Sequence, residues 1–246
     1  MFQPLLNACR RCFQPAPDAV ALASAKRLAY HMTAVSPKPS FSQCGEDLIV
    51  RYYCQTHGLP RPTFLDIGAF DPWMLSNTAL FYLEGSHGLI IEPNTARIGA
   101  FASARPRDIC VNMGVADRTG SMTYYQFDAE TLNTFSAGEA QRLREIEGHR
   151  QTGQAEVAVD TLPQILARYW HQPFPDFLSL DVEGSVHPIL DSLKNTAALP
   201  KIMCVETISY SQDADKGVKD ARLIAMISSL GFQVYADTHI NTIFVQ

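Results

Sequence analysis

Acidic residues follow several short apolar runs of this chain, at the points where predicted strands end. Asp66 and Glu92 end the first two of these runs, Asp181 and Glu183 follow a later one, and Glu206 ends the run after that. The carboxyl ends of parallel strands meet at one edge of a sheet, so we expect these side chains to gather there. A single acid after a strand is usually a helix cap or a solvated loop residue. A series of them predicts a binding or catalytic site.

The spacing of the first two acids indicates what one part of this site binds. Glu92 follows Asp66 by 26 residues, about the length of a turn, a helix and a strand. In nucleoside-binding sheets, the acid that ends the second strand accepts hydrogen bonds from ribose hydroxyls. The first turn contains the single glycine Gly68 and lacks the G-x-G-x-x-G pattern of a pyrophosphate loop. An acid beside one glycine suits a cationic ligand that joins a nucleoside to an amino acid, which describes S-adenosylmethionine.

The three later acids are candidates for proton transfer. Asp181 and Glu183 are two residues apart at one strand end, and Glu206 ends the neighbouring strand. Carboxylates that are crowded together or buried have raised pKa values, which suits a general base. The alternative is that Glu183 and Glu206 only cap helices. The three groups could also hold a divalent cation such as Mg²⁺, but no metal is predicted.

Other polar residues are weaker candidates. His187 and His239 could act as bases or contact a substrate, although lone histidines are more often surface or core residues. Ser136 and Glu139 have the spacing of a capping box and predict a charged helix that runs to about Gly148. That helix could be a lid over the site or simply a solvated surface.

Composition limits the class of protein. The chain has 246 residues, with 46% apolar and 18% charged, which is enough for one packed α/β domain. Its net charge of −5 argues against a protein that binds nucleic-acid phosphates, since such domains carry a basic excess. The six cysteines are scattered and do not form a disulfide framework, so we expect a cytoplasmic protein.

Residues 1–39 are expected to form a helical extension and linker, and residues 40–246 the main domain. The longest apolar stretch of the extension, residues 19–25, is far shorter than the ~20 residues that span a bilayer, so no membrane span is expected. Asp18 could cap an amphipathic helix there. We expect that helix to pack on the domain or to form contacts between subunits of a homo-oligomer.

The segments that carry these candidate residues alternate between predicted strands and predicted helices. This alternation predicts βαβ units and a mostly parallel, doubly wound α/β sheet. A closing strand pair with a tight turn adds one antiparallel strand near the edge. The predicted strands cover residues 63–67, 88–92, 108–113, 121–127, 155–160, 176–181, 201–206, 232–236 and 242–245. The predicted helices cover residues 76–84, 94–104, 136–148, 161–170, 185–193 and 217–230.

Several sequence blocks carry a resemblance to a known family. They are Ser42-Gln-Cys-Gly-Glu-Asp47, Phe64-Leu-Asp-Ile-Gly-Ala-Phe70, Ser76-Asn-Thr78, Gly88-Leu-Ile-Ile-Glu-Pro-Asn94, Asp176-Phe-Leu-Ser-Leu-Asp-Val-Glu-Gly184, Val205-Glu-Thr207 and Asn241-Thr-Ile-Phe-Val245. In this order, over residues 41–246, the chain resembles the FkbM family of S-adenosylmethionine-dependent methyltransferases. The resemblance implies a Rossmann-like class I methyltransferase sheet of seven strands, whose antiparallel strand is residues 241–245.

The resemblance also implies roles for individual residues. It assigns these residues to the cofactor: Asp66 and Gly68 beside the methionine part, Glu92 at the ribose, Asn112 and Gly114 at the adenine, Asp181 nearest the methyl group, and Ala69 and Pro93 as adjacent contacts. Two positions depart from the family pattern. The family usually has a second acid two residues after Gly184, where this chain has Val186, and its common Thr-Leu-Asp reads Thr161-Leu-Pro163 here. The acceptor could therefore differ from that of typical members.

The expected activity is methylation of a hydroxyl on a sugar, a glycan or a glycosylated metabolite, with a small molecule or glycan as acceptor. An amine acceptor is an alternative, because a carboxylate could also take the proton of an ammonium group. A non-catalytic nucleoside-binding module with the same fold is a second alternative. A nicotinamide oxidoreductase is disfavoured because the glycine fingerprint is missing.

Overall fold

The computed structural model describes residues 38–145, 148–182, 186–194, 196, 198–209 and 217–246. By internal contacts the chain divides into Met1–Pro39 and Ser40–Gln246. Almost all of the first unit, including the helix expected after Asp18, lies outside the described residues. The second unit contains every element described below.

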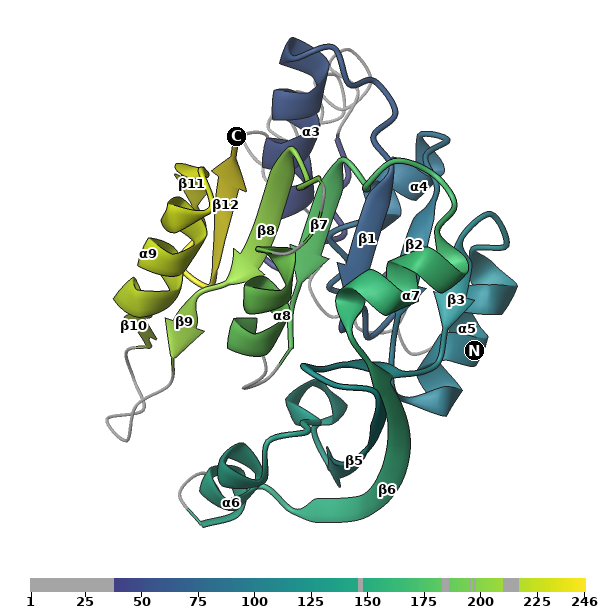
Figure 1. Cartoon of the computed structure of the whole chain (residues 1–246), viewed down its shortest axis with the longest axis vertical. Helices are drawn as coiled ribbons and strands as arrows, with labels where there is room; N and C mark the ends of the chain where they lie inside the picture. Colours follow the sequence, from purple (N-terminus) through teal and green to yellow (C-terminus); the bar gives the residue numbers. More distant parts are fainter. Residues whose placement is uncertain (1–37, 146–147, 183–185, 195, 197, 210–216) are drawn as a thin grey trace, which may run out of the picture. The chain divides into compact units, whose positions relative to one another are not determined.

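A seven-stranded sheet forms the centre of the second unit, in the order β11-β12-β8-β7-β1-β2-β3 (Figure 1). The strands are β1 (Phe64–Ile67), β2 (Gly88–Ile91), β3 (Ile109–Val111), β7 (Phe177–Leu180), β8 (Ile202–Glu206), β11 (Gln233–Asp237) and β12 (Asn241–Val245). β12 is antiparallel to both of its neighbours, and the other pairs are parallel. This arrangement confirms the predicted fold class, including its single reversed strand near the edge.

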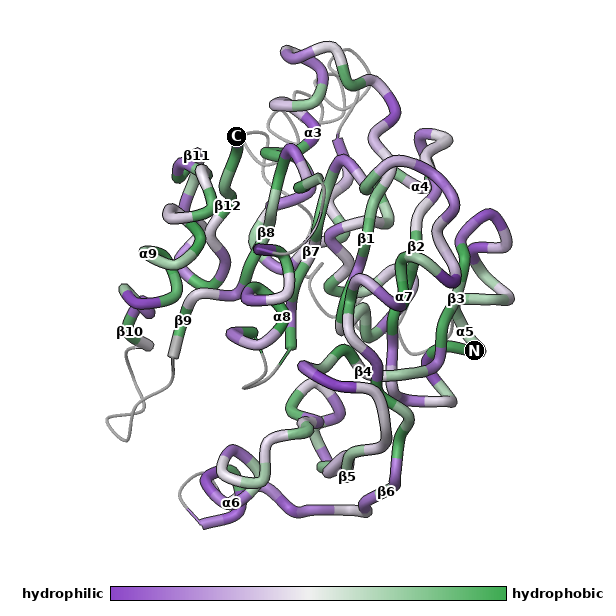
Figure 2. The backbone as a smooth tube through the Cα atoms, viewed as in Figure 1, coloured by the Kyte–Doolittle hydropathy of each residue, from purple (hydrophilic) through white to green (hydrophobic). Residues whose placement is uncertain are grey.

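Helices cover both faces of this sheet (Figure 1). α3 (Glu46–Thr56), α4 (Ala79–Leu83) and α5 (Thr95–Ala104) pack on one face. α7 (Leu162–Tyr169), α8 (Val186–Leu193) and α9 (Ala221–Ser229) pack on the other. Because both faces are covered, the central strands are buried at every residue and mostly apolar, without a regular alternation of apolar and polar residues (Figure 2).

A smaller unit follows β3 and lies beyond the carboxyl ends of the parallel strands (Figure 1). We call this segment, residues 114–160, the insert. It contains β4 (Gly114–Val115), β5 (Gly120–Phe127), the 3₁₀ helix η1 (Glu130–Leu132), α6 (Ala137–Glu145) and β6 (Gln151–Asp160), with strand order β4-β6-β5. The strand predicted over residues 121–127 is β5, and it pairs with β6 and not with the main sheet. Residues 151–158 are largely exposed and polar, so β6 packs mainly through its β5 pairing and not in a core.

Two helices begin later than predicted. α4 starts at Ala79 instead of residue 76, although Ser76 Oγ still accepts a hydrogen bond from the Ala79 amide at 3.1 Å. α9 starts at Ala221, where the Asp220 side chain caps it by accepting from the Leu223 amide at 2.9 Å. The preceding residues form β10 (Val218–Lys219), which pairs with β9 (Ile208–Ser209). Short strands of two residues carry too little periodicity to be recognised in a sequence.

Candidate active site

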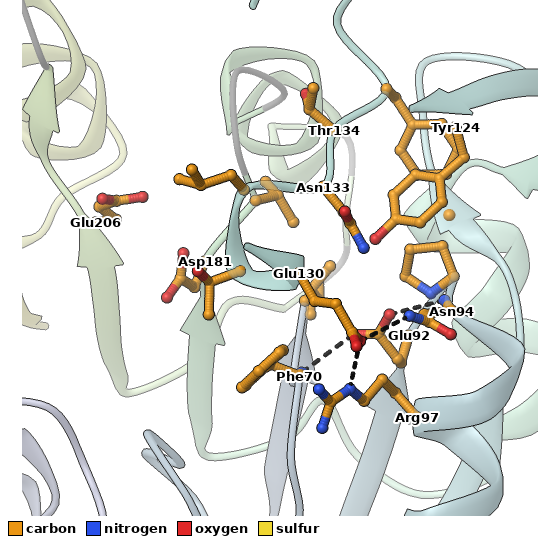
Figure 3. A pocket seen from close by; sticks show the side chains of 18 of the residues that line it. Phe70, Glu92, Asn94, Arg97, Tyr124, Glu130, Asn133, Thr134, Asp181 and Glu206 are labelled. Carbon is orange, nitrogen blue, oxygen red and sulfur yellow. Dashed lines mark hydrogen bonds and ion pairs between the residues drawn. The ribbon is translucent and has the colours of Figure 1, made fainter. Parts of the chain in front are cut away.

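A cavity of about 370 Å³ lies at the carboxyl edge of the parallel strands, between that edge and the insert. This volume is within the usual range for small-molecule sites. Figure 3 shows side chains of both parts facing the same space. The lining residues from the sheet and its loops include Gln43, Gly68, Phe70, Leu75, Glu92, Pro93, Asp181 and Glu206, and those from the insert include Gly114, Tyr124, Glu130, Asn133, Phe135 and Arg142.

The first turn brings two strand ends into close contact. Gly68 has φ +78°, a conformation that favours glycine, and its amide donates to the carbonyl of Ile91 at 3.0 Å. A Cβ atom at this position would lie 1.8 Å from the carbonyl oxygen of Asp181. The turn can therefore approach the end of β7 only because residue 68 has no side chain.

Glu92 lies at the end of β2, where its carboxylate is buried against the cavity wall. One oxygen accepts from the amide of Phe70 at 3.1 Å and the other from the amide of Asn94 at 2.7 Å (Figure 3). Burial raises the pKa of Glu92 to about 7, although these two hydrogen bonds lower it. A carboxylate has about four acceptor positions, so each oxygen can still accept one hydrogen bond from a ligand.

Aromatic and amide groups of the insert face Glu92 across the cavity. The Tyr124 hydroxyl points toward Asn133 and Glu92 (Figure 3). Burial raises the pKa of Tyr124, and the nearby charge of Glu92 raises it further, so this phenol stays protonated. The Phe135 ring lies 4.8 Å from the Tyr124 ring, and it fills the space that a Cβ at Gly114 would need. The two rings therefore pack on each other and form an apolar wall of the cavity, next to the hydrogen-bonding groups of Tyr124 and Asn133.

Arg97 connects the two sides of the cavity. Its Nε donates to Glu130 of the insert at 2.8 Å, and its Nη1 donates to Asp71 of the first turn at 3.3 Å. The guanidinium carbon also lies 4.3 Å from the centre of the Phe70 ring. Asn94 makes a further contact of 3.4 Å with the same Glu130 oxygen.

Asp181 and Glu206 form a carboxylate pair at the ends of neighbouring strands (Figure 3). Asp181 is open to the cavity, yet protein surrounds the carboxyl group enough that desolvation raises its pKa to about 6. A hydrogen bond with Glu206 lowers this pKa, and the charges of Asp66 and Glu46 raise it. Asp181 is therefore mostly ionised at neutral pH and close to its titration range.

A comparison with protein-family models decides the family of this chain. The model described as the Methyltransferase FkbM domain matches residues 66–234. The chain belongs to the FkbM methyltransferase family. A comparison with curated proteins returned no match. The FkbM match runs from β1 to the start of β11 and includes the insert, so it covers most of the cavity wall.

The residues that the FkbM resemblance assigned to the cofactor do not all reach the cavity. Gly68, Glu92, Pro93, Gly114 and Asp181 line it, and so does the predicted catalytic residue Glu206. Glu183 lies outside the described residues.

Three of the assigned residues do not line the cavity of this FkbM site: two are buried in the domain and one is exposed outside the cavity. Asp66 is buried, and its carboxylate accepts from Thr78 Oγ1 at 2.6 Å. Burial raises the pKa of Asp66. Ala69 is buried in the apolar core under the first turn. Asn112 is exposed and donates to the backbone carbonyls of Glu92 and Pro93, both at 2.9 Å.

Other candidates from the sequence are now placed. His239 is exposed in the turn before β12 with φ +76°, and neither it nor His187 lines the cavity. The predicted charged helix is α6, whose Arg142 lines the cavity and pairs with Glu139. Within the described part of the chain, no group of three metal-ligating side chains is arranged to hold an ion. No helix in that part is long and apolar enough to cross a membrane.

The insert residues were missed by the sequence analysis. Tyr124 lies in the strand predicted over residues 121–127, but alternation does not reveal which way a strand faces, and Glu130 and Asn133 follow it in a stretch with no predicted element. The only signal was position: the insert directly follows the third strand, at the carboxyl edge of the sheet, where loops of α/β folds contribute to sites. Arg97 was also missed, since it lies inside the helix predicted over residues 94–104 and nothing in that pattern marks it.

Proposed function

We propose that this methyltransferase transfers a methyl group from S-adenosylmethionine to a hydroxyl of a sugar, in a glycan or a glycosylated metabolite. The observation that carries the proposal is that Glu92 and Asp181 line one cavity. One carboxylate has spare acceptor positions for a ribose, and the other has a pKa of about 6, suited to a base. The choice of a sugar hydroxyl follows from the family resemblance, because a carboxylate base would serve an amine acceptor as well.

The residues present fit this cofactor. In this proposal the methionine part lies beside Gly68, which lines the cavity, and Glu92 accepts from both ribose hydroxyls. In this proposal the adenine packs against the apolar wall that Tyr124 and Phe135 form beside Gly114. When bound, S-adenosylmethionine supplies a methyl group activated by a sulfonium.

The protein's own contribution is to orient the acceptor and to remove its proton. Displacement at the methyl carbon needs the attacking oxygen in line and about 3 Å away. In this proposal the Asp181 carboxylate accepts the proton of the attacking hydroxyl as the oxygen–carbon bond forms. Glu206 holds Asp181 in place through their hydrogen bond and keeps its pKa below neutrality.

The test has two stages. Calorimetric titration with S-adenosylhomocysteine, in Mg²⁺ and in a chelator, measures whether the cavity binds the cofactor product. Methyl transfer from labelled S-adenosylmethionine to sugars and glycosides then identifies the acceptor. Saturable binding at micromolar strength with transfer to a sugar oxygen is the expected result. Folded protein that does not bind would exclude the cofactor, and transfer only to amines would exclude the hydroxyl acceptor.

A further inference from the structure

Three consecutive large apolar residues are exposed in the loop between β1 and α4. Trp73, Met74 and Leu75 have exposed fractions of 36%, 54% and 43%. We call residues 73–75 the apolar rim. Single exposed apolar residues are common, but contiguous patches mark surfaces that bind something.

The apolar rim is held in a fixed conformation. Asp71 Oδ1 accepts from the amides of Trp73 and Met74, both at 3.0 Å, while Asp71 Oδ2 pairs with Arg97. On the other side, the Ser76 amide donates to the carbonyl of Phe41 at 2.9 Å. These contacts fix the backbone around the three side chains, so the rim is presented to solvent in an ordered shape.

Leu75 connects the rim to the cavity. Its side chain lines the cavity, and its φ of +55° lies in the left-handed region that non-glycine residues rarely adopt. Asn or Gly would adopt this conformation with less strain, and both would remove the apolar side chain. Strained residues persist where the surrounding structure enforces them and cluster at ligand sites. The position of a leucine here therefore points to a ligand with an apolar part.

We propose that the apolar rim binds a hydrocarbon portion of the methyl acceptor, attached to the sugar whose hydroxyl reaches Asp181. This inference rests on the proposed function and names its substrate class: glycosides with an apolar aglycone, not free sugars. Because Leu75 belongs to both surfaces, an acceptor with its sugar in the cavity extends directly onto the rim. The unbranched Met74 side chain adapts to hydrocarbon groups of different shape.

The test uses the two tryptophans of the chain as reporters. Trp73 is half-exposed on the rim, whereas Trp170 is buried and donates to the Pro173 carbonyl at 2.7 Å, so Trp170 is an internal control. The whole chain is labelled with 5-fluorotryptophan, and W73F assigns the two fluorine resonances. Octyl β-glucoside, below its micelle concentration, and methyl β-glucoside are titrated in the presence of S-adenosylhomocysteine.

The expected result is a saturable shift of the Trp73 resonance with octyl glucoside, while the Trp170 resonance does not move. The dissociation constant from this shift should be at least tenfold lower for octyl glucoside than for methyl glucoside. The L75N variant, whose new side chain suits a positive φ, should weaken this binding about tenfold. L83Q changes a leucine that is exposed but does not line the cavity, and it should leave this binding unchanged.

Three results would contradict the proposal. They are equal shifts at both tryptophans, no shift at all, and a Trp73 shift that follows protein concentration together with dimer formation in light scattering. The last would assign the rim to self-association. Calorimetry with S-adenosylhomocysteine on the same samples separates the two proposals. If the cofactor product binds while octyl glucoside leaves Trp73 unchanged, only the rim proposal fails.

Discussion

Gly68 lies against the backbone of Asp181 so closely that a Cβ atom would be 1.8 Å from the Asp181 carbonyl oxygen. The turn proposed to hold the cofactor is thus in direct backbone contact with the residue proposed as the base. The strands beneath them are in register, with Ile67 paired to Leu180. Any residue larger than glycine has to push these two parts of the site apart.

Replacing Gly68 by alanine should therefore be severe. We expect G68A to lower the free energy of unfolding by about 2–4 kcal/mol, because overpacking adds to the strain of a positive φ. Gly58 is a matched control: its φ is +71°, but no atom lies within 4 Å of its Cβ position. G58A should lose only about 1 kcal/mol in urea denaturation. An equal loss of unfolding free energy in the two variants would show that backbone strain, and not contact with Asp181, makes the substitution at residue 68 destabilising.

Glu92→Gln should weaken binding of S-adenosylhomocysteine about tenfold to hundredfold, since hydrogen bonds to a charged acceptor contribute about 1.5–3 kcal/mol. Calorimetry measures the change. E156Q is the control, because Glu156 is exposed on β6 and accepts only from Thr123 at 2.6 Å. Affinity within a factor of two of the unmodified protein would remove Glu92 from the ribose role.

The raised pKa of Glu92 predicts a dependence of stability on pH. With a folded pKa of about 7 against an ordinary value of 4.5, the folded protein holds this proton more tightly than the unfolded chain does. The resulting stabilisation is complete below about pH 4.5 and is lost as pH rises through 7, by about 3 kcal/mol in total. E92Q lacks this group, so its stability relative to the unmodified protein should increase between pH 5 and pH 8. Parallel pH profiles of the two proteins would contradict the assignment.

Asp181→Asn should separate catalysis from binding. We expect turnover to fall by about 10²–10⁴-fold, as for loss of a general base, while affinity for S-adenosylhomocysteine changes by less than about threefold. In the unmodified enzyme, turnover should rise with pH through about 6, because only the ionised carboxylate accepts a proton. D191N, at an exposed acid of α8, is the control. A parallel loss of turnover and affinity would make Asp181 a binding residue.

Arg97→Met should loosen both loops that flank the cavity, since Arg97 pairs with Asp71 on one side and Glu130 on the other. We expect faster amide hydrogen exchange near both carboxylates and roughly fivefold weaker cofactor binding, which corresponds to about 1 kcal/mol. R118M, at an exposed pair with Asp117, should change neither quantity. If exchange increased at only one loop, Arg97 would not couple the two.

The sequence predicted the parallel strands and the reversed strand because each is a short run with clear boundaries. Buried parallel strands are continuous apolar runs, and the residues at their carboxyl ends must meet at one edge. Glu92, Asp181 and Glu206 were found in this way. Asp66 also lies near the carboxyl end of its strand, but its side chain accepts a hydrogen bond from Thr78 and does not reach the cavity. The position of a residue along a strand does not reveal this direction of its side chain.

The insert could not be placed from the sequence. Its strands pair with each other and not with the main sheet, and pairing partners are not encoded in the pattern of a single strand. Tyr124 and Asn133 reach the cavity only because the insert folds back across the sheet edge. The block around residues 42–47 was similarly ambiguous. Gln43 of this block lines the cavity, while Glu46 and Asp47 accept hydrogen bonds from the local backbone.

The contact between Glu46 and β12 has a consequence for how the chain folds. Glu46 accepts from Thr238 at 2.6 Å and from Asn241 at 3.1 Å, and Asn241 pairs with Glu206. The contacts of Glu46 join residues nearly 200 positions apart, and such non-local contacts form slowly. During synthesis on the ribosome, β8 emerges with a bare apolar edge and waits for residues 241–245. Until they arrive, that edge is open to pairing with another chain.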